Sequence, residues 1–199
     1  MSIPRSAHVL PLLLAAATLP FAPPLWAQHT VTFTPSNKIV IEGKSNVHAW
    51  TCATSTFEAT ATAPELPLSE SGSKLSTLTL SIPVQSLDCG HGDMNKNLRK
   101  TMHADQHPAI TYHMTSYAAT RKGDSYEVNM DGAVTINGVE KPIHVHASVT
   151  PNATGGADVV GSAPIRTTDF GVQPVKVMLG TLRTSPDVTI TFRLTAIRK

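Results

Sequence analysis

Alternation of apolar and polar residues with a period of two is the main pattern of this chain beyond its first 27 residues. Successive side chains of a β-strand point to opposite faces, so this alternation is typical of strands that are buried on one side. The alternating stretches are residues 31–33, 39–50, 57–63, 78–84, 110–114, 128–136, 143–149, 158–167 and 188–197. We therefore predict about eight strands joined by short turns.

The connections between these stretches favour an antiparallel sheet. Asn137 and Gly138 separate two of them, and this dipeptide tolerates the positive φ angles of a tight hairpin. No helices alternate with the strands, as they would in a parallel sheet. The expected class is all-β.

One segment departs from the strand pattern. Met94, Leu98 and Met102 recur every four residues, which predicts an amphipathic helix over Asp93–His103. Its first residue, an aspartate, is a suitable N-cap, and Pro108 ends the helical stretch. Such a helix suits a lid or plug on a barrel, although a helix packed on the outside fits the periodicity equally well.

The first 27 residues have the composition of a cleaved export signal. Arg5 supplies a positive charge, residues 9–19 are an apolar run, and Ala27 closes a plausible cleavage site. The run is too short to cross a bilayer comfortably, and no second stretch long and apolar enough follows it. We expect residues 1–27 to be removed, which leaves a mature domain of residues 28–199 with no integral membrane segment.

Charge and cysteine content narrow the function further. The chain has 16 Lys+Arg, 14 Asp+Glu and a net charge of +2, whereas a nucleic-acid binder would show a basic stripe with interleaved aromatic residues. We therefore expect no nucleic-acid partner. Cys52 and Cys89 are the only cysteines. In an oxidising compartment they would form one disulfide, and two free buried thiols are the alternative.

No catalytic motif is evident in the sequence. It lacks a G-x-S-x-G nucleophile elbow, a Walker loop and G-x-G-x-x-G, and its carboxylates are sparse. We predict that the protein is not an enzyme and needs no cofactor. A hydrolase and a purely structural module are lesser alternatives.

Histidines offer the main competing signal. His144 and His146 share one face of a strand, at a spacing at which two imidazoles can share a zinc or copper ion. The apolar residues between and beside them claim the opposite, buried face, so we expect both histidines to face solvent and predict no metal site. With His107 or His113 as a third ligand, they would instead form a metal- or haem-handling site, which is the alternative function.

The best alternating rows predict the wall of an internal cavity. Their even-numbered residues are apolar and their odd-numbered residues are mostly Thr, Ser and His, so the even set should face inward. Trp50 shares a predicted strand face with His48, and both a cavity wall and a packed core suit this pair. The residues expected to contact a ligand are Phe33, Trp50, Leu78, Leu80, Ile82, Met94, Leu98, Ile110, Tyr112, Met114, Phe170 and Phe192.

Several segments together resemble the YceI-like family. They are Ser86-Leu87-Asp88, Asp93 with Leu98-Arg99, His107-Pro108-Ala109-Ile110-Thr111-Tyr112, the hairpin of residues 132–142, and Thr168-Asp169-Phe170-Gly171-Val172. The match spans essentially residues 30–197, in order. The resemblance implies an eight-stranded, antiparallel, lipocalin-like barrel that is exported to the periplasm and encloses an isoprenoid or fatty-acid-like chain. His107 stands where the family usually has Tyr, and His48-Ala49-Trp50 and Met178-Leu179-Gly180 resemble a divergent branch of the family.

Elementary energetics agree with this resemblance. The interior of an eight-stranded barrel admits one slim ligand, and each methylene moved into it from water is worth about 0.8 kcal/mol. We predict an eight-stranded antiparallel lipocalin-like barrel with one short amphipathic helix. Its expected role is that of a non-catalytic periplasmic carrier or store of a polyisoprenoid, quinone-like or fatty-acyl molecule.

Overall fold

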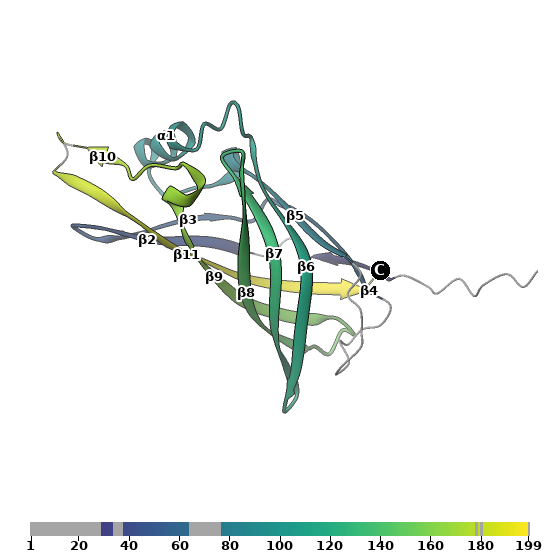
Figure 1. The fold of residues 1–199 in the computed structure, drawn as a ribbon. Helices are drawn as coiled ribbons and strands as arrows, with labels where there is room; N and C mark the ends of the chain where they lie inside the picture. Colours follow the sequence, from purple (N-terminus) through teal and green to yellow (C-terminus); the bar gives the residue numbers. More distant parts are fainter. Residues whose placement is uncertain (1–28, 34–37, 64–76, 178, 180, 199) are drawn as a thin grey trace, which may run out of the picture.

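The computed structural model describes residues 29–33, 38–63, 77–177, 179 and 181–198, and the predicted export signal lies outside them. Strands dominate the described residues, which contain a single α-helix (Figure 1). The strands are β1 (His29–Phe33), β2 (Lys38–Ser45), β3 (Ala49–Thr54), β4 (Glu58–Ala63), β5 (Thr77–Pro83), β6 (Ala109–Lys122), β7 (Ser125–Ile136), β8 (Val139–Pro151), β9 (Ala157–Arg166), β10 (Lys176–Val177) and β11 (Leu182–Arg198). The helix is α1 (Gly92–Thr101), and two short 3-10 helices are η1 (Val84–Ser86) and η2 (Thr167–Phe170).

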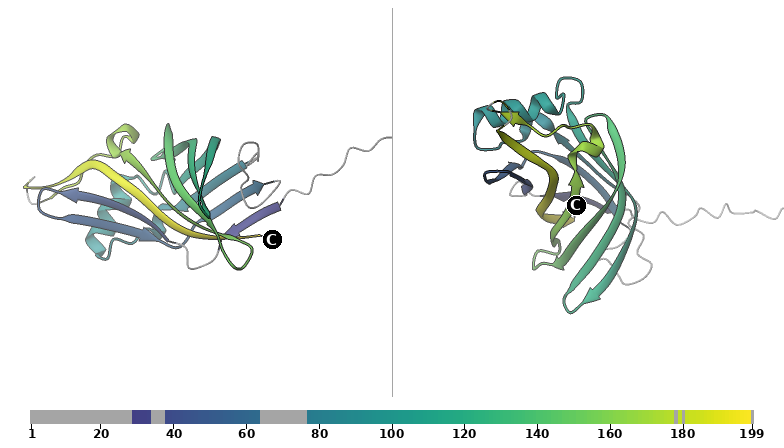
Figure 2. Two further views of the ribbon diagram at one scale, coloured as in Figure 1. Left: turned by 90° about the horizontal axis from the view of Figure 1, so that it is seen from below. Right: turned by 60° about the vertical axis from the view of Figure 1, so that its left-hand side comes forward.

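The strands form one antiparallel sheet that curls back on itself. β1 pairs with both β4 and β11, so the order β1-β4-β5-β6-β7-β8-β9-β11 returns to β1 as a ring of eight strands. β2 pairs with residues 184–193 of β11, which precede the residues that pair with β1, and β3 pairs with the other edge of β2. Figure 2 shows the curl from two further sides. The predicted antiparallel barrel with one short helix is confirmed.

The hairpin signal between β7 and β8 is also confirmed. Asn137 and Gly138 form the turn with φ angles of 53° and 74°. Both lie in the left-handed region, as a two-residue hairpin turn requires.

The predicted stretch over residues 39–50 is wrong as a single strand, because a turn divides it into β2 and β3. The Ser45 hydroxyl donates to the carbonyl oxygen of His48 at 2.9 Å and accepts from the backbone N–H groups of Val47 (3.2 Å) and His48 (3.0 Å). A serine side chain can thus replace ladder hydrogen bonds locally. His48 consequently precedes β3 and does not share a strand face with Trp50.

The predicted helix is present, with one correction at its start. Its N-cap is His91, which makes no side-chain capping hydrogen bond, and Asp93 lies within the first turn. The carboxylate of Asp93 is still well placed there, because the amino end of a helix carries partial positive charge.

A disulfide joins β3 to the loop before α1. Cys52 is bonded to Cys89, as predicted, and both cysteines of the chain are used. Next to it, the backbones of Ala53 and Asp88 exchange two hydrogen bonds of 2.8 and 2.9 Å. This loop is therefore fixed to the sheet covalently and by hydrogen bonds.

A closed core lies where η1 and the turn after α1 meet the sheet. Its most buried members are Val84 and Leu87, each 1% exposed, and Met102 and Ala104 pack in the same cluster. In the described part of the chain, no helix combines the length and the apolar character needed to cross a membrane.

Candidate ligand-binding cavity

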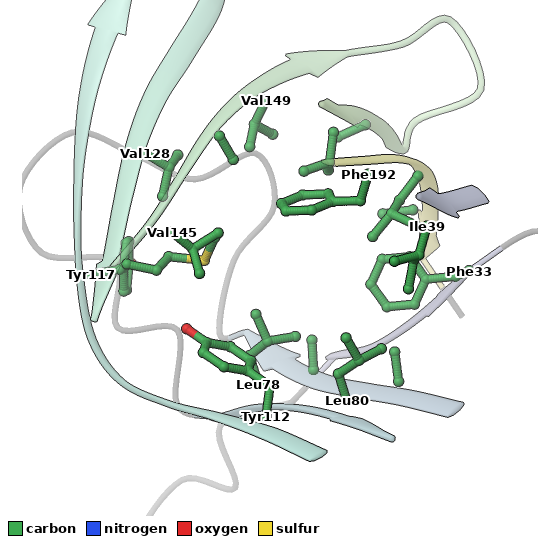
Figure 3. A pocket seen from close by; sticks show the side chains of 18 of the residues that line it. Phe33, Ile39, Leu78, Leu80, Tyr112, Tyr117, Val128, Val145, Val149 and Phe192 are labelled. Atoms are coloured by element: carbon green, nitrogen blue, oxygen red, sulfur yellow. The ribbon is translucent and has the colours of Figure 1, made fainter. Parts of the chain in front are cut away.

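An apolar cavity of about 310 Å³ lies inside the curl of the sheet, and we name it the apolar chamber (Figure 3). Its volume falls at the lower end of the range of about 300–1,000 Å³ that is common for small-molecule sites. Its walls come from residues far apart in sequence, which the barrel brings together. Those residues include Phe33, Ile39, Leu78, Leu80, Ile82, Ile110, Tyr112, Tyr117, Tyr126, Val128, Met130, Val134, Ile143, Val145, Ala147, Val149, Ile190, Phe192 and Leu194.

Glycines make room for the aromatic side chains of this wall. The ring of Phe192 lies over Gly161, the residue opposite it on β9, and the ring of Tyr112 lies over Gly132 on β7. A Cβ atom at either glycine would clash with the ring. Because these two glycines have no side chain, the rings can lie close against the sheet. The interior of the chamber is thereby left open.

Tyr112 is the most unusual polar group of the apolar chamber. Its hydroxyl is buried and has no hydrogen-bond partner among the described residues. Burial, and then the nearby charge of Asp131, raise the pKa of Tyr112 to about 12. The phenol is therefore neutral at physiological pH, and the chamber keeps its apolar character.

A second cavity of about 790 Å³ lies beside α1, and we name it the helix-side chamber. Ile110 and Ile190 line both chambers, so the two are adjacent. The helix-side chamber is less apolar. Its charged and imidazole side chains are His48, His91, Asp93, Lys96 and Lys100.

Trp50 belongs to the wall of the helix-side chamber. Its ring lies against Gly43, its partner on β2, where a Cβ atom would clash with the indole. His48 lines the same chamber from the β2–β3 turn. The sequence left open whether Trp50 and His48 line a cavity or pack in a core. In the structure both residues line the helix-side chamber.

The helix likewise borders this chamber instead of packing away from it. Met94 and Leu98 of α1 line it, as does Met102 at the end of the helix, which is 5% exposed and also packs in the core. Figure 1 shows α1 at one end of the curled sheet. The helical periodicity allowed either a lid on the barrel or a helix packed on the outside. The position of α1 beside the chamber fits a lid over one end of the barrel better.

The structure places ten of the twelve predicted contact residues on a chamber wall. Seven line the apolar chamber: Phe33, Leu78, Leu80, Ile82, Ile110, Tyr112 and Phe192. Trp50, Met94 and Leu98 line the helix-side chamber, as does Ile110.

Met114 and Phe170 line neither chamber. The ring of Tyr112 lies over Gly132, which is opposite Met114, and so takes the wall position expected for Met114. Phe170 lies in η2, is 3% exposed and packs in the closed core.

Sequence reasoning missed the far wall of the apolar chamber. Val128, Met130 and Val134 of β7 and the apolar face of β8 supply much of it. Their alternation was visible in the sequence, but it could not show whether a buried face meets a cavity or a closed core. Residues between 172 and 184 supply part of the wall of the helix-side chamber, and their sequence shows no alternation that could have predicted this.

The two adjacent histidines point away from both chambers, as predicted. The side chains of His144 and His146 are 91% and 59% exposed. The Nδ1 atom of His144 lies 2.5 Å from Asp131, and the Nε2 atom of His146 lies 2.9 Å from Glu127. Hydrogen bonding to His144, and then to Ser116, holds the pKa of Asp131 below its usual value.

These histidines are not assembled into a metal centre. In the described ranges, no three His, Cys, Asp or Glu side chains are positioned to hold a metal ion together. His113 lies on β6 opposite Ala133, and the ring of His107 lies beside Gly138. Neither joins His144 and His146 as a third ligand.

Solved structures share this fold at low sequence identity. BcnA of Burkholderia cenocepacia has a TM-score of 0.69 and 21% identity, covering 83% of this chain and 100% of that one. A polyisoprenoid binding domain from Saccharophagus degradans has a TM-score of 0.60 and 13% identity, covering 84% and 97%. The YCEI protein of Campylobacter jejuni has a TM-score of 0.54 and 18% identity, covering 78% and 84%.

Sequence relatives overlap with part of the chain. The UPF0312 protein of Pseudomonas aeruginosa is 31% identical over 101 residues, which are 47% of this chain and 51% of the relative. That of Pectobacterium atrosepticum is 31% identical over 74 residues, 36% of each chain. The matched region is thus about half the length of the Pseudomonas aeruginosa relative and 36% of the Pectobacterium atrosepticum relative. The family model of the YceI-like domain matches residues 27–196. The chain belongs to the YceI-like family.

Proposed function

We propose that this protein is a non-catalytic binding protein of the periplasm that holds a long apolar ligand in its barrel. The ligand would be a polyisoprenoid, a quinone-like molecule or a fatty-acyl chain. The apolar chamber is the observation that carries the proposal, because its wall is built almost entirely from aliphatic and aromatic side chains (Figure 3).

The chemistry of this wall favours a ligand held by burial of apolar surface. Each methylene that leaves water is worth about 0.8 kcal/mol, so about ten of them supply about 8 kcal/mol before entropic costs. The neutral phenol of Tyr112 adds no charge that an apolar chain would have to desolvate. No bond needs to form or break in this role.

Family membership supports the same class of ligand. One protein of similar fold is described as a polyisoprenoid binding domain, and the two adjacent chambers of this chain suit an elongated molecule. The apolar run and the small residue at Ala27 support export to the periplasm. Export would also provide the oxidising setting in which a disulfide between Cys52 and Cys89 persists.

Native mass spectrometry of protein purified from its own host tests the proposal directly. We expect the mass of a chain that begins at Gln28, together with a lipid-sized ligand that denaturing conditions release. A stoichiometric metal or haem in place of a lipid would favour the histidine-based alternative. Protein that carries no ligand and takes up no fluorescent fatty acid after delipidation would contradict the proposal.

A further inference from the structure

The two most exposed large aliphatic side chains lie at one end of the molecule. Four large hydrophobic residues are exposed in the described part of the chain: Leu179 (109%), Val47 (68%), Val160 (42%) and Ile197 (39%). Val47 lies in the β2–β3 turn and Leu179 in the connection between β10 and β11. These segments are more than 130 residues apart in sequence.

Hydrogen bonds of Asn46 hold these two turns together. The side-chain amide of Asn46 donates to the carbonyl oxygen of Thr181 at 2.8 Å, and its side-chain oxygen accepts from the N–H of Arg183 at 2.9 Å. The backbone N–H of Asn46 donates to the carbonyl oxygen of Arg183 at 3.0 Å. We name the described residues of these two segments, 44–49, 176, 177, 179 and 181–183, the double tip. Figure 2 (left) shows the β2–β3 turn and the start of β11 projecting together, away from the C-terminus.

The double tip is basic as well as apolar. It contains Lys44, Lys176 and Arg183 and no aspartate or glutamate, whereas the whole chain has a net charge of only +2. Cations therefore flank the two exposed aliphatic side chains. This combination matches the interface of an anionic bilayer, where apolar side chains enter the headgroup region and Lys and Arg pair with lipid phosphates.

The double tip also forms part of a chamber wall. Ser45, His48 and Leu182 belong to it and line the helix-side chamber. Contact between this end and a membrane would therefore bring the helix-side chamber next to the lipid surface. We infer that the double tip docks the protein on an anionic phospholipid bilayer.

Vesicle co-sedimentation of the delipidated full chain tests this inference. The vesicles are phosphatidylcholine alone or phosphatidylcholine mixed with phosphatidylglycerol, and no pocket ligand is added, so the result is independent of the proposed ligand binding. We expect binding to the mixed vesicles that weakens as salt is raised. Lys44→Gln with Lys176→Gln should weaken it on the order of 25-fold, at about fivefold per cation. Val47→Ser with Leu179→Ser should weaken it by about tenfold or more.

The matched control replaces the other two exposed aliphatic residues, Val160→Ser with Ile197→Ser, which should bind as the wild type does. Thermal unfolding of each variant verifies that it is folded. In addition, brominated lipids should quench the fluorescence introduced by Leu179→Trp and not that introduced by Val160→Trp. Equal binding to both kinds of vesicle, no binding to either, or unchanged binding of the double-tip variants would overturn the inference.

Discussion

The indole ring of Trp50 lies directly against the backbone of Gly43, its cross-strand partner on β2. All the atoms that a Cβ on Gly43 would meet first belong to this ring. Gly43 is buried, so its lack of a side chain is what gives the indole its position at the helix-side chamber.

Gly43→Ala is therefore expected to displace the Trp50 ring. Overpacking of this kind lowers the free energy of unfolding by about 1–3 kcal/mol, and the emission of Trp50 should shift as the indole leaves its site. Urea unfolding and fluorescence measure the two effects. In a Trp50→Leu background the alanine should be tolerated better. An equal loss of stability in both backgrounds would show that the ring is not what excludes the Cβ atom.

The apolar chamber and the closed core should respond differently to the same substitution. Leu80 lines the chamber, whereas Leu87 is 1% exposed and lines neither cavity. Leu80→Trp should fill the chamber and abolish uptake of a fluorescent fatty acid while changing the melting temperature little. Leu87→Trp should lower stability by about 1–3 kcal/mol or more. If Leu80→Trp were as destabilising as Leu87→Trp, the chamber would be a packed core.

Removal of the disulfide should destabilise the protein measurably. The bond closes a loop with a sequence separation of 37 residues, which corresponds to about 4 kcal/mol in the loop-entropy model. Cys52→Ala with Cys89→Ala should therefore lower the free energy of unfolding by about that amount, and reductant should have a similar effect on the wild type alone. Labelling of both thiols in folded, unreduced protein would contradict the bridge.

The outer-face histidines should have no role in ligand binding. His144→Ala with His146→Ala is expected to leave uptake of the fluorescent fatty acid unchanged, because both side chains point away from the chambers. The loss of the hydrogen bond to His144 should raise the pKa of Asp131 toward its usual value, which NMR titration of the carboxyl can follow. Loss of ligand or of a bound metal in this variant would support the histidine-based function instead.

Alkaline pH should weaken the fold through Tyr112. Its pKa is raised from 10.0 to about 12 in the folded protein, so above pH 10 the unfolded chain loses this proton while the folded protein still holds it. The free energy of unfolding therefore decreases as pH rises from 10 toward 12. Tyr112→Phe should remove this part of the pH dependence, as urea unfolding at about pH 9 and about pH 11 can measure. Identical slopes in both proteins would show that the phenol is solvated.

Alternation along the chain was sufficient to predict most of the strands and one side of the apolar chamber. Leu78, Leu80 and Ile82 face inward as their row required, because a strand with one buried face fixes the orientation of every side chain. The Asn137-Gly138 turn was equally local, since it depends on the φ preferences of two residues.

Features that depend on contacts between distant residues could not be predicted in this way. The site of the Phe192 ring depends on a register that places Gly161 opposite it. The helix-side chamber needs Leu182 beside the β2–β3 turn, which no local pattern encodes. The turn at Ser45 was missed because its hydroxyl replaces the ladder hydrogen bonds within an otherwise regular stretch.

The register shift between Met114 and Ser116 determines which residue β6 can lose without disturbing the chamber wall. Met114 pairs with Gly132 and Ser116 with Asp131, so Thr115 is an extra residue that has no partner in the ladder. Because it is absorbed there, Tyr117 still faces the apolar chamber although its number has the opposite parity to that of Tyr112. Loss of Thr115 in evolution would straighten the strand and leave every inward residue inward. Loss of a residue from a regular part of β6 would instead reverse the facing of every residue on one side of the deletion. Apolar wall residues there would turn to solvent and polar residues would turn into the chamber.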